Sequence, residues 1–203
     1  MTDQAPKPAK SRPGTSKLTS DSVAPTDLGL ERKIVCLVAY NPHWPEWFAA
    51  EVARLRDVLG DRIGEIEHIG STAIPSLPAK PILDMMASVE SLTEAERLIP
   101  QLRTLGYEWG PRDMEDVPDR RYFVRRREDG ASTHHLSLAM KTSHFWRGQL
   151  GFRDWLRARP EVREAYARLK HELAARFPAD RPAYLEGKSD FVRQVLAVSL
   201  PSI

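Results

Sequence analysis

The amino-acid sequence predicts an α+β fold in which a small mixed β-sheet is flanked by helices and the C-terminal part is helical. Two observations predict it. Short apolar or alternating segments typical of strands occur only before about residue 140 of the 203-residue chain, and helical spacing of apolar residues dominates the remainder. Sheet elements followed by a run of helices are typical of the α+β class.

The composition is that of a globular protein of the cytoplasm. Hydrophobic residues make up 41% of the chain and charged residues 29%. The 30 basic and 28 acidic residues leave a net charge of +2, which provides no overall attraction to nucleic acid or to an anionic membrane. The single cysteine, Cys36, cannot form an internal disulfide, and its apolar neighbours favour a core position. Because no apolar run is long enough to cross a bilayer, we expect no membrane partner and a cytoplasmic location.

The first 30 residues are rich in Pro, Ser, Thr, Lys and Ala and almost lack large apolar side chains. Such a segment buries too little apolar surface to offset the entropy of ordering it. We therefore expect a disordered N-terminal tail over residues 1–30 and one folded domain over residues 31–203.

The expected elements follow from apolar spacing and from Pro, Gly and capping residues. Pro45 and Gly60 bracket one helix, and the capping pattern Ser91 to Glu94 opens another that stops at Gly106. Asp129-Gly130 is a common hairpin turn pair between two strands. Strands are expected over 34–40, 63–69, 81–89, 121–127 and 133–140. Helices are expected over 45–59, 91–105, 144–159, 160–177 and 182–199.

The segment from His68 to Asp84 carries the strongest chemical signal. A strand runs into Gly70-Ser71-Thr72, where backbone N–H groups and small hydroxyls can bind a phosphate. Lys80 adds a positive charge, and Asp84 in the following strand could hold Mg²⁺ on that phosphate. The alternative is a tight proline-containing turn with a buried, hydrogen-bonded Asp84. An aspartate among apolar neighbours is costly without a partner or a cleft, which argues against that alternative.

Strand alternation relates Asp84 to a second polar pair. The apolar residues of segment 133–140 mark its core face, with His134 alongside them, so His135 and Ser137 lie on the opposite face. If the two strands are neighbours, His135 and Ser137 share a cleft with Asp84. His135 could then bind a metal with Asp84, hydrogen-bond a phosphate, or act as an acid or base. His134 is expected to be structural.

Other polar residues have two interpretations each. The arginines of segment 120–127 are either a solvated strand face or an anion clamp, in which Arg121 and Arg125 are the preferred substrate-binding residues. Tyr184 and Lys188, four residues apart on one helical face, are either a surface pair or a substrate-contacting edge. His68 either supports the Gly-Ser turn or binds a ligand.

Several of these segments resemble the GrpB family. The resemblance covers nearly everything from about residue 35 to residue 196, and includes Tyr184, Lys188 and Phe191. It is carried by the segments His68 to Pro75, Ala79 to Asp84, Thr133 to Leu136 and Phe152 to Arg157. GrpB-like domains are similar in fold to the nucleotidyltransferase superfamily, and some are fused to dephospho-CoA kinase.

The resemblance implies a nucleotidyltransferase-like fold and a cleft around Gly70, Ser71 and Asp84. Three positions depart from the expected patterns. Active nucleotidyltransferases usually carry a second carboxylate where this chain has Met86, and two-metal transfer needs several carboxylates. Ser137 replaces a histidine typical of the family, and Ser76 replaces a glycine common in the family loop.

Two functional hypotheses remain. The first is a Mg²⁺-dependent nucleotidyltransferase acting on a small-molecule acceptor, with Asp84 and His135 at the reaction centre. The second is a non-catalytic binding or accessory module for a nucleotide, a CoA-like molecule or another phosphorylated ligand. We expect no nucleic-acid partner on either hypothesis, because aromatic residues are not interleaved with the basic ones with the regularity of a single-strand-binding surface.

Overall fold

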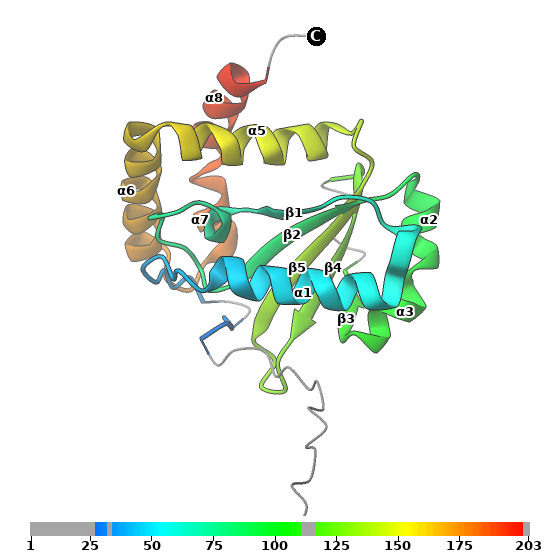
Figure 1. The fold of residues 1–203 in the computed structure, drawn as a ribbon. Coiled ribbons are helices and arrows are strands. Elements are labelled where there is room, and N and C mark those ends of the chain that lie inside the picture. Colours follow the sequence, from blue (N-terminus) through cyan, green and yellow to red (C-terminus); the bar gives the residue numbers. More distant parts are fainter. Residues whose placement is uncertain (1–26, 32–33, 111–116, 201–203) are drawn as a thin grey trace, which may run out of the picture.

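The computed structural model describes residues 27–31, 34–110 and 117–200, and within them one sheet of five strands in the order β1-β2-β5-β4-β3. β2 and β5 pair in parallel, whereas every other neighbouring pair is antiparallel. The mixed sheet and the helical C-terminal part confirm the predicted α+β class (Figure 1). The strands are β1 (Ile66–Ile69), β2 (Leu83–Ser88), β3 (Tyr107–Trp109), β4 (Arg120–Arg126) and β5 (Ser132–Ala139).

The helices begin at the capping and proline residues that the sequence offers. The Ser91 and Ser143 hydroxyls accept hydrogen bonds from the backbone N–H groups of Glu94 and Trp146, and proline occupies the first turn of α1, α3, α6 and α7. The helices are α1 (Trp44–Leu59), α2 (Leu92–Arg97), α3 (Ile99–Thr104), α5 (His144–Ala158), α6 (Pro160–Arg176), α7 (Arg181–Glu186) and α8 (Ser189–Ser199).

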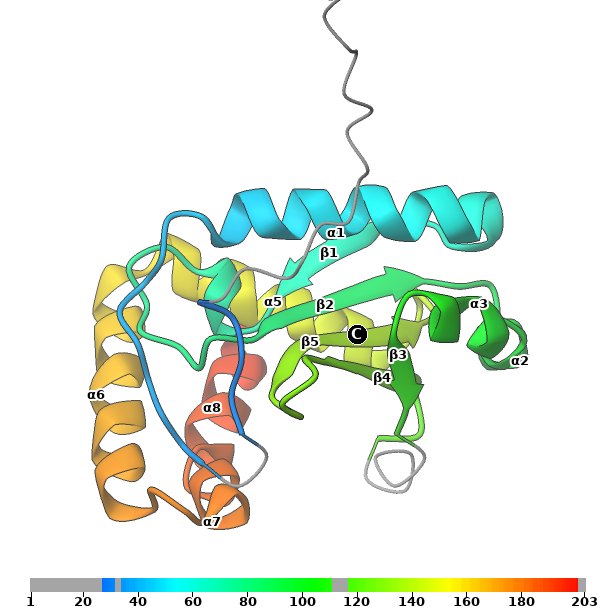
Figure 2. The same cartoon turned by 90° about the horizontal axis from the view of Figure 1, so that it is seen from below.

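The two faces of the sheet are covered by different helices (Figures 1 and 2). On one face, Leu55 of α1 and Leu102 of α3 pack with Met85, Phe123 and Leu136 in the main core. On the other face, α5 crosses the sheet, where Trp146 packs on Ile69 and Met86. Helices α6 and α8 pack on α5 and on the β1–β2 connection through Ile74, Leu77, Leu156, Tyr166 and Val195. The far face of the sheet is thus only partly covered by α5.

Three elements differ from the prediction. β3 was not expected, because three residues are too few to show a strand period. The helix expected over 91–105 is two short helices that meet at Leu98, and Pro100 lies at the start of the second. The helix expected over 182–199 is broken at Gly187, where an added Cβ would collide with the side chain of Leu173 on α6. A residue with a Cβ at the break would therefore displace the tip of the buried Leu173 side chain.

The strand expected over 34–40 is absent, and Val38 makes only an isolated antiparallel bridge to Ala79. Val35 is buried against α6 and α7 while Cys36 is exposed, so the expected core position of Cys36 is wrong. The physical reason is that this apolar run meets loop residues, such as the Pro178 carbonyl that accepts from the Val35 N–H, rather than a sheet edge.

The predicted N-terminal tail lies for the most part outside the described residues. Its last residues are packed, however. Leu28 is fully buried beside Trp44 and Leu83, and the backbone of Leu30 pairs with Ser132. The packed part of the chain therefore begins before the predicted boundary at residue 31. Among the described residues, no helix combines the length and the apolar character needed to span a bilayer.

Candidate functional site

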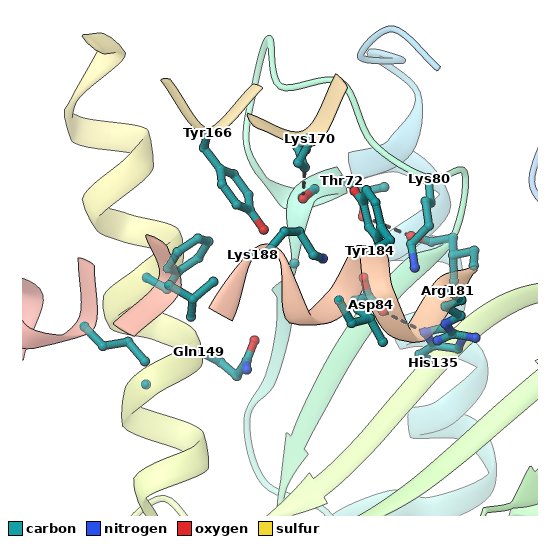
Figure 3. A pocket seen from close by; sticks show the side chains of 18 of the residues that line it. Thr72, Lys80, Asp84, His135, Gln149, Tyr166, Lys170, Arg181, Tyr184 and Lys188 are labelled. Atoms are coloured by element: carbon teal, nitrogen blue, oxygen red, sulfur yellow. Dashed lines mark hydrogen bonds and ion pairs between the residues drawn. The ribbon is translucent and has the colours of Figure 1, made fainter. Parts of the chain in front are cut away.

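A pocket of about 480 Å³ lies between the exposed end of the sheet face and the C-terminal helices. Its floor is formed by Asp84 of β2, His135 of β5 and the Gly70–Thr72 turn, and its walls by α5, α6, α7 and α8 (Figure 3). The volume falls within the usual range for small-molecule sites.

Gly70 brings the Gly-Ser turn directly against Asp84. Its φ of 69° is in the region that favours glycine, and an added Cβ would lie 2.8 Å from the Cβ of Asp84. The register of β1 with β2 places Ile69 opposite Asp84, so the turn begins one residue beyond the carboxylate. The sequence signal of a strand running into Gly-Ser therefore corresponds to a close approach between the turn and the aspartate.

Asp84 and His135 form a hydrogen-bonded pair on the pocket floor. They are opposite each other in the parallel register of β2 and β5, and the His135 Nδ1 and Asp84 Oδ1 atoms lie 2.8 Å apart. Burial disfavours the charged form of Asp84, but the hydrogen bond from His135 and the charges of His135 and Lys80 outweigh it and lower the pKa of the carboxyl. The bond uses Nδ1, which leaves Nε2 of His135 available to a ligand.

Four cationic side chains surround this pair: Lys80, Lys170, Arg181 and Lys188. Figure 3 shows them around the space above Asp84 and His135. None of the four forms an ion pair within the described part of the chain, and Asp84 is the one acidic residue among the described residues lining the pocket. The imbalance of charge favours an anionic ligand.

The lysines of the pocket are packed closely against neighbouring groups. Lys170 is 1% exposed, and its Nζ donates to the Ser71 hydroxyl at 3.1 Å and to the Pro78 carbonyl. The Tyr184 ring lies between Lys80 and Lys188, whose Nζ atoms are 5.9 and 4.5 Å from its centroid. Burial, together with the charges of neighbouring lysines, lowers the pKa of both Lys170 and Lys188 to about 7.

The Gly-Ser turn has its own support from buried residues. His68 stacks on Phe48 of α1, and its Nε2 lies 3.0 Å from the hydroxyl of Thr72, which donates to the Ile82 carbonyl. Burial lowers the pKa of His68 to about 4, so the ring is neutral at pH 7. His68 does not line the pocket, and the geometry gives it the support role rather than the ligand role.

The structure does not bring three of the predicted substrate-binding residues to this pocket. Arg121 pairs with Glu96 of α2, and Arg125 pairs with Glu51 of α1 at 2.7 Å. Both lie on the opposite face of the sheet, because β4 pairs Arg125 with His134 and Phe123 with Leu136.

Ser137 lies on the same face of β5 as His135, two residues farther along the strand. It is buried, and its hydroxyl accepts a hydrogen bond from Arg120 at 3.1 Å. The neighbouring Met86, which stands where a second carboxylate would be expected, packs under α5 against Trp146. Helix α5 therefore covers this part of the face and leaves Asp84 and His135 at its uncovered end.

The sequence analysis missed two of the four cations, Lys170 and Arg181. A signal for Lys170 was present, because Tyr166, Lys170 and Leu173 have the spacing of one buried helical face. A lysine on an apolar stripe needs a partner or a polar cavity. Arg181 lies in the first turn of a short helix and offered no comparable pattern.

The described residues do not by themselves supply a full set of metal ligands. Within the described residues, no group of three or more His, Cys, Asp or Glu side chains could hold a metal ion. Of the described residues that line the pocket, Asp84 alone is a carboxylate, and it already accepts from His135, while the surrounding cations oppose a divalent ion. Mg²⁺ prefers oxygen ligands in octahedral geometry. The predicted Mg²⁺ site at Asp84 and His135 therefore stays a prediction that needs a direct test.

Comparison with known proteins places the chain in a family. Residues 34–197 match the profile of the family described as GrpB protein. The chain belongs to the GrpB family. A crystal structure of the conserved GrpB protein from Enterococcus faecalis is similar with a TM-score of 0.73 and 29% identity, over 81% of this chain and 96% of that one. The GrpB match spans all of the pocket residues from Gly70 to Lys188.

Two GrpB-like relatives are longer than this chain. UPF0157 protein YqkA of Bacillus subtilis is 36% identical over 162 residues, which are 80% of this chain and 46% of that protein. A protein named dephospho-CoA kinase from Mycolicibacterium paratuberculosis is 34% identical over 81% of this chain and 46% of its own length. The chain thus spans about half the length of these two relatives.

Proposed function

We propose that the pocket binds a nucleoside triphosphate or a related phosphorylated molecule and that the protein transfers its nucleotidyl group to a small acceptor. The observation that carries the binding half is that the described lining of the pocket has four cationic side chains and one carboxylate. Lys170 also bonds Ser71, which ties the cationic wall to the Gly70–Thr72 turn. Backbone N–H groups at such a turn and ammonium groups are both common phosphate ligands.

The transfer half rests on the hydrogen bond between Asp84 and His135. An imidazole held by a carboxylate through one nitrogen can accept a proton at the other. The acceptor oxygen would form a bond to the α-phosphorus while its proton passes to Nε2 of His135. The bond from that phosphorus to the bridging oxygen would break, and pyrophosphate would leave with the electron pair. Lys170 and Lys188 are placed to offset the charge on the phosphates.

The second candidate is a binding module without turnover. It is favoured by Met86, which removes the second carboxylate of two-metal transfer, and by the absence of a metal-ligand cluster in the described residues. The relative named dephospho-CoA kinase supports a nucleotide-like or CoA-like ligand for either candidate. The two candidates share the pocket and differ in the role of Asp84 and His135.

Thermal-shift binding followed by a pyrophosphate-release assay tests the proposal. ATP, the other nucleoside triphosphates and CoA are each measured with and without Mg²⁺. A ligand at a hundred times its dissociation constant should stabilise the native protein by about 2.7 kcal/mol. Lys188→Met should weaken binding about tenfold or more through the loss of a charge-assisted hydrogen bond. No shift with any compound would overturn the proposal.

Asp84→Asn separates the two candidates. For the transferase, pyrophosphate release should fall by about a hundredfold or more while the thermal shift by ATP persists, since the amide cannot stabilise the protonated imidazole. A pure binding module releases no pyrophosphate in either form. A shift that requires Mg²⁺ and disappears in Asp84→Asn would assign the metal to Asp84. The melting temperature without ligand serves as the control for folding.

A further inference from the structure

A second, smaller hollow of about 280 Å³ lies beside the pocket, and His135 and Arg181 line both. We call it the β4 groove, because Tyr122, Val124 and Arg126 of β4 form one side of it. Pro182 and Leu185 of α7 form the other side. His135, at the proposed reaction centre, therefore lies between the pocket and the β4 groove.

The β4 groove follows from the alternation of β4. Val124 is opposite His135 in the antiparallel register of β4 and β5, so Tyr122, Val124 and Arg126 share the face of His135. These are the β4 residues on the other side of the strand from Arg121 and Arg125. The Tyr122 ring is close to the His135 ring, with centroids 5.4 Å apart.

The chemistry of the β4 groove differs from that of the pocket. Among the described residues that line it there is no lysine, and the two guanidinium groups, Arg126 and Arg181, are suited to a planar carboxylate. Arg126 pairs with Glu108 at 3.2 Å, but the Glu108 side chain is 73% exposed, so this ion pair is weak. Val124, Pro182 and the Tyr122 ring supply a small apolar surface.

We propose that the β4 groove is the acceptor subsite and takes a small hydroxy- or amino-carboxylate. This inference rests on the proposed transfer reaction. Arg126 and Arg181 would bind the carboxylate, and the hydroxyl or amine would lie at Nε2 of His135. The acceptor would then meet the α-phosphorus of a nucleotide in the pocket at His135, which lines both spaces. As its oxygen or nitrogen bonds to phosphorus, its proton would go to Nε2, and pyrophosphate would leave with the electron pair of the broken P–O bond.

The test is a titration of the ¹⁵N-labelled chain followed by amide chemical shifts. The probes are 4-hydroxybenzoate, L-tyrosine and L-serine, with uncharged 4-hydroxybenzamide as the control and ATP as the pocket ligand. At least one carboxylate should shift the amides of Val124, Arg126 and Leu185 in the presence of saturating ATP. ATP itself should shift Gly70 and Ser71. The amide control should bind at least about tenfold more weakly than its carboxylate partner, since it lacks the charge that arginine recognises.

Paired variants give the decisive pattern. Arg126→Glu, at a partly exposed site, should abolish the carboxylate shifts and leave the ATP shifts unchanged, whereas Lys188→Met should weaken ATP and leave the carboxylate shifts unchanged. No carboxylate shift at β4, or displacement of the carboxylate by ATP, would overturn the acceptor subsite. If the carboxylate binds β4 while ATP shifts no amide in the pocket, the β4 groove is a carboxylate site, and its role as acceptor subsite fails together with the proposed nucleotide binding.

Discussion

Lys170 occupies a position in α6 that an apolar residue would ordinarily take. It lies between Tyr166 and Leu173 on the buried face of the helix, and its Nζ reaches the Ser71 hydroxyl. Burial lowers its pKa, and that of Lys188, to about 7, well below the ordinary value for lysine. The charge of these two side chains should therefore change across neutral pH, and we expect anion binding to respond to pH.

We expect anion affinity to fall about tenfold or more between about pH 7 and about pH 9, where an ordinary lysine stays charged. Sulfate is the suitable probe because its own charge is constant there, and calorimetry is the measurement. The stability of the ligand-free protein should change in the opposite sense. The folded lysines bind fewer protons than the unfolded ones above about pH 7, so stability contributed by these groups rises with pH. Sulfate affinity that is flat across this range would contradict the lowered pKa values of Lys170 and Lys188, or their contact with the anion.

Ser76 adopts a backbone conformation that favours glycine, with a φ of 66°. The left-handed conformation costs a residue with a Cβ roughly 1–2 kcal/mol, part of which is returned by the smaller unfolded-state entropy of serine. Ser76→Gly should therefore stabilise the protein by about 0.5–1 kcal/mol, measured by denaturant unfolding. Ser76→Ala keeps the steric cost and should give no such gain. Equal stability of the two variants would show that the backbone is not strained.

The arginines of β4 show how far strand alternation predicts the position of a single side chain. Alternation correctly grouped Arg121 and Arg125 with Phe123, and Phe123 is buried in the main core. A large apolar residue on one face of a strand marks the buried face, so the arginines beside it were predictably far from a cleft on the other face. Strand parity predicted that Asp84 and His135 lie on the open faces of their strands, but not that β2 and β5 are neighbours, which is what pairs the two side chains.

At the scale of elements, the two faces of β4 have different roles: one packs in the core, and the other lines the proposed acceptor subsite. On its core face Arg125 bonds Glu51, whose Oε1 also accepts from the Tyr107 hydroxyl at 3.0 Å. Burial raises the pKa of Glu51 despite the opposing charge of Arg54, so this carboxylate depends on its partners. On the other face the same strand lines the β4 groove.

Arg125→Met should destabilise the protein by about 3 kcal/mol, because it leaves a buried carboxylate with one cationic partner fewer. ATP affinity should stay within about twofold of the wild type, since the change is on the far face of the sheet. Denaturant unfolding and calorimetry measure the two effects. Arg126→Ala, on the opposite face of the same strand, is the control and should change stability by less than about 0.5 kcal/mol. A large loss of ATP affinity in folded Arg125→Met would place Arg125 in the binding site after all.

The break between α7 and α8 was not predictable from apolar spacing, which continues through it. It occurs at Gly187, where the side chain of Leu173 approaches from a different helix. The break matters for the site because Arg181 and Tyr184 lie before it and Lys188 immediately after it. Long-range packing of this kind leaves little signal in a local sequence pattern.

At the scale of the molecule, one face of the sheet forms the main core and the other forms the floor of the pocket. One face is sealed by α1, α2 and α3 over the main core. The other is covered by α5 only as far as Met86, and the C-terminal helices enclose the remaining end as a pocket. A ligand held between the sheet and α6 to α8 would connect two parts of the molecule that otherwise meet mainly through α5 and the β1–β2 connection (Figure 1).

A crystal structure with ATP would test the central claim most directly. The account predicts the phosphates between the Gly70–Thr72 turn and the ammonium groups of Lys170 and Lys188, with the α-phosphate nearest His135. It also predicts that the Asp84–His135 hydrogen bond is kept. Phosphates bound at another surface, or a pocket that stays closed to ATP at saturating concentration, would contradict the account.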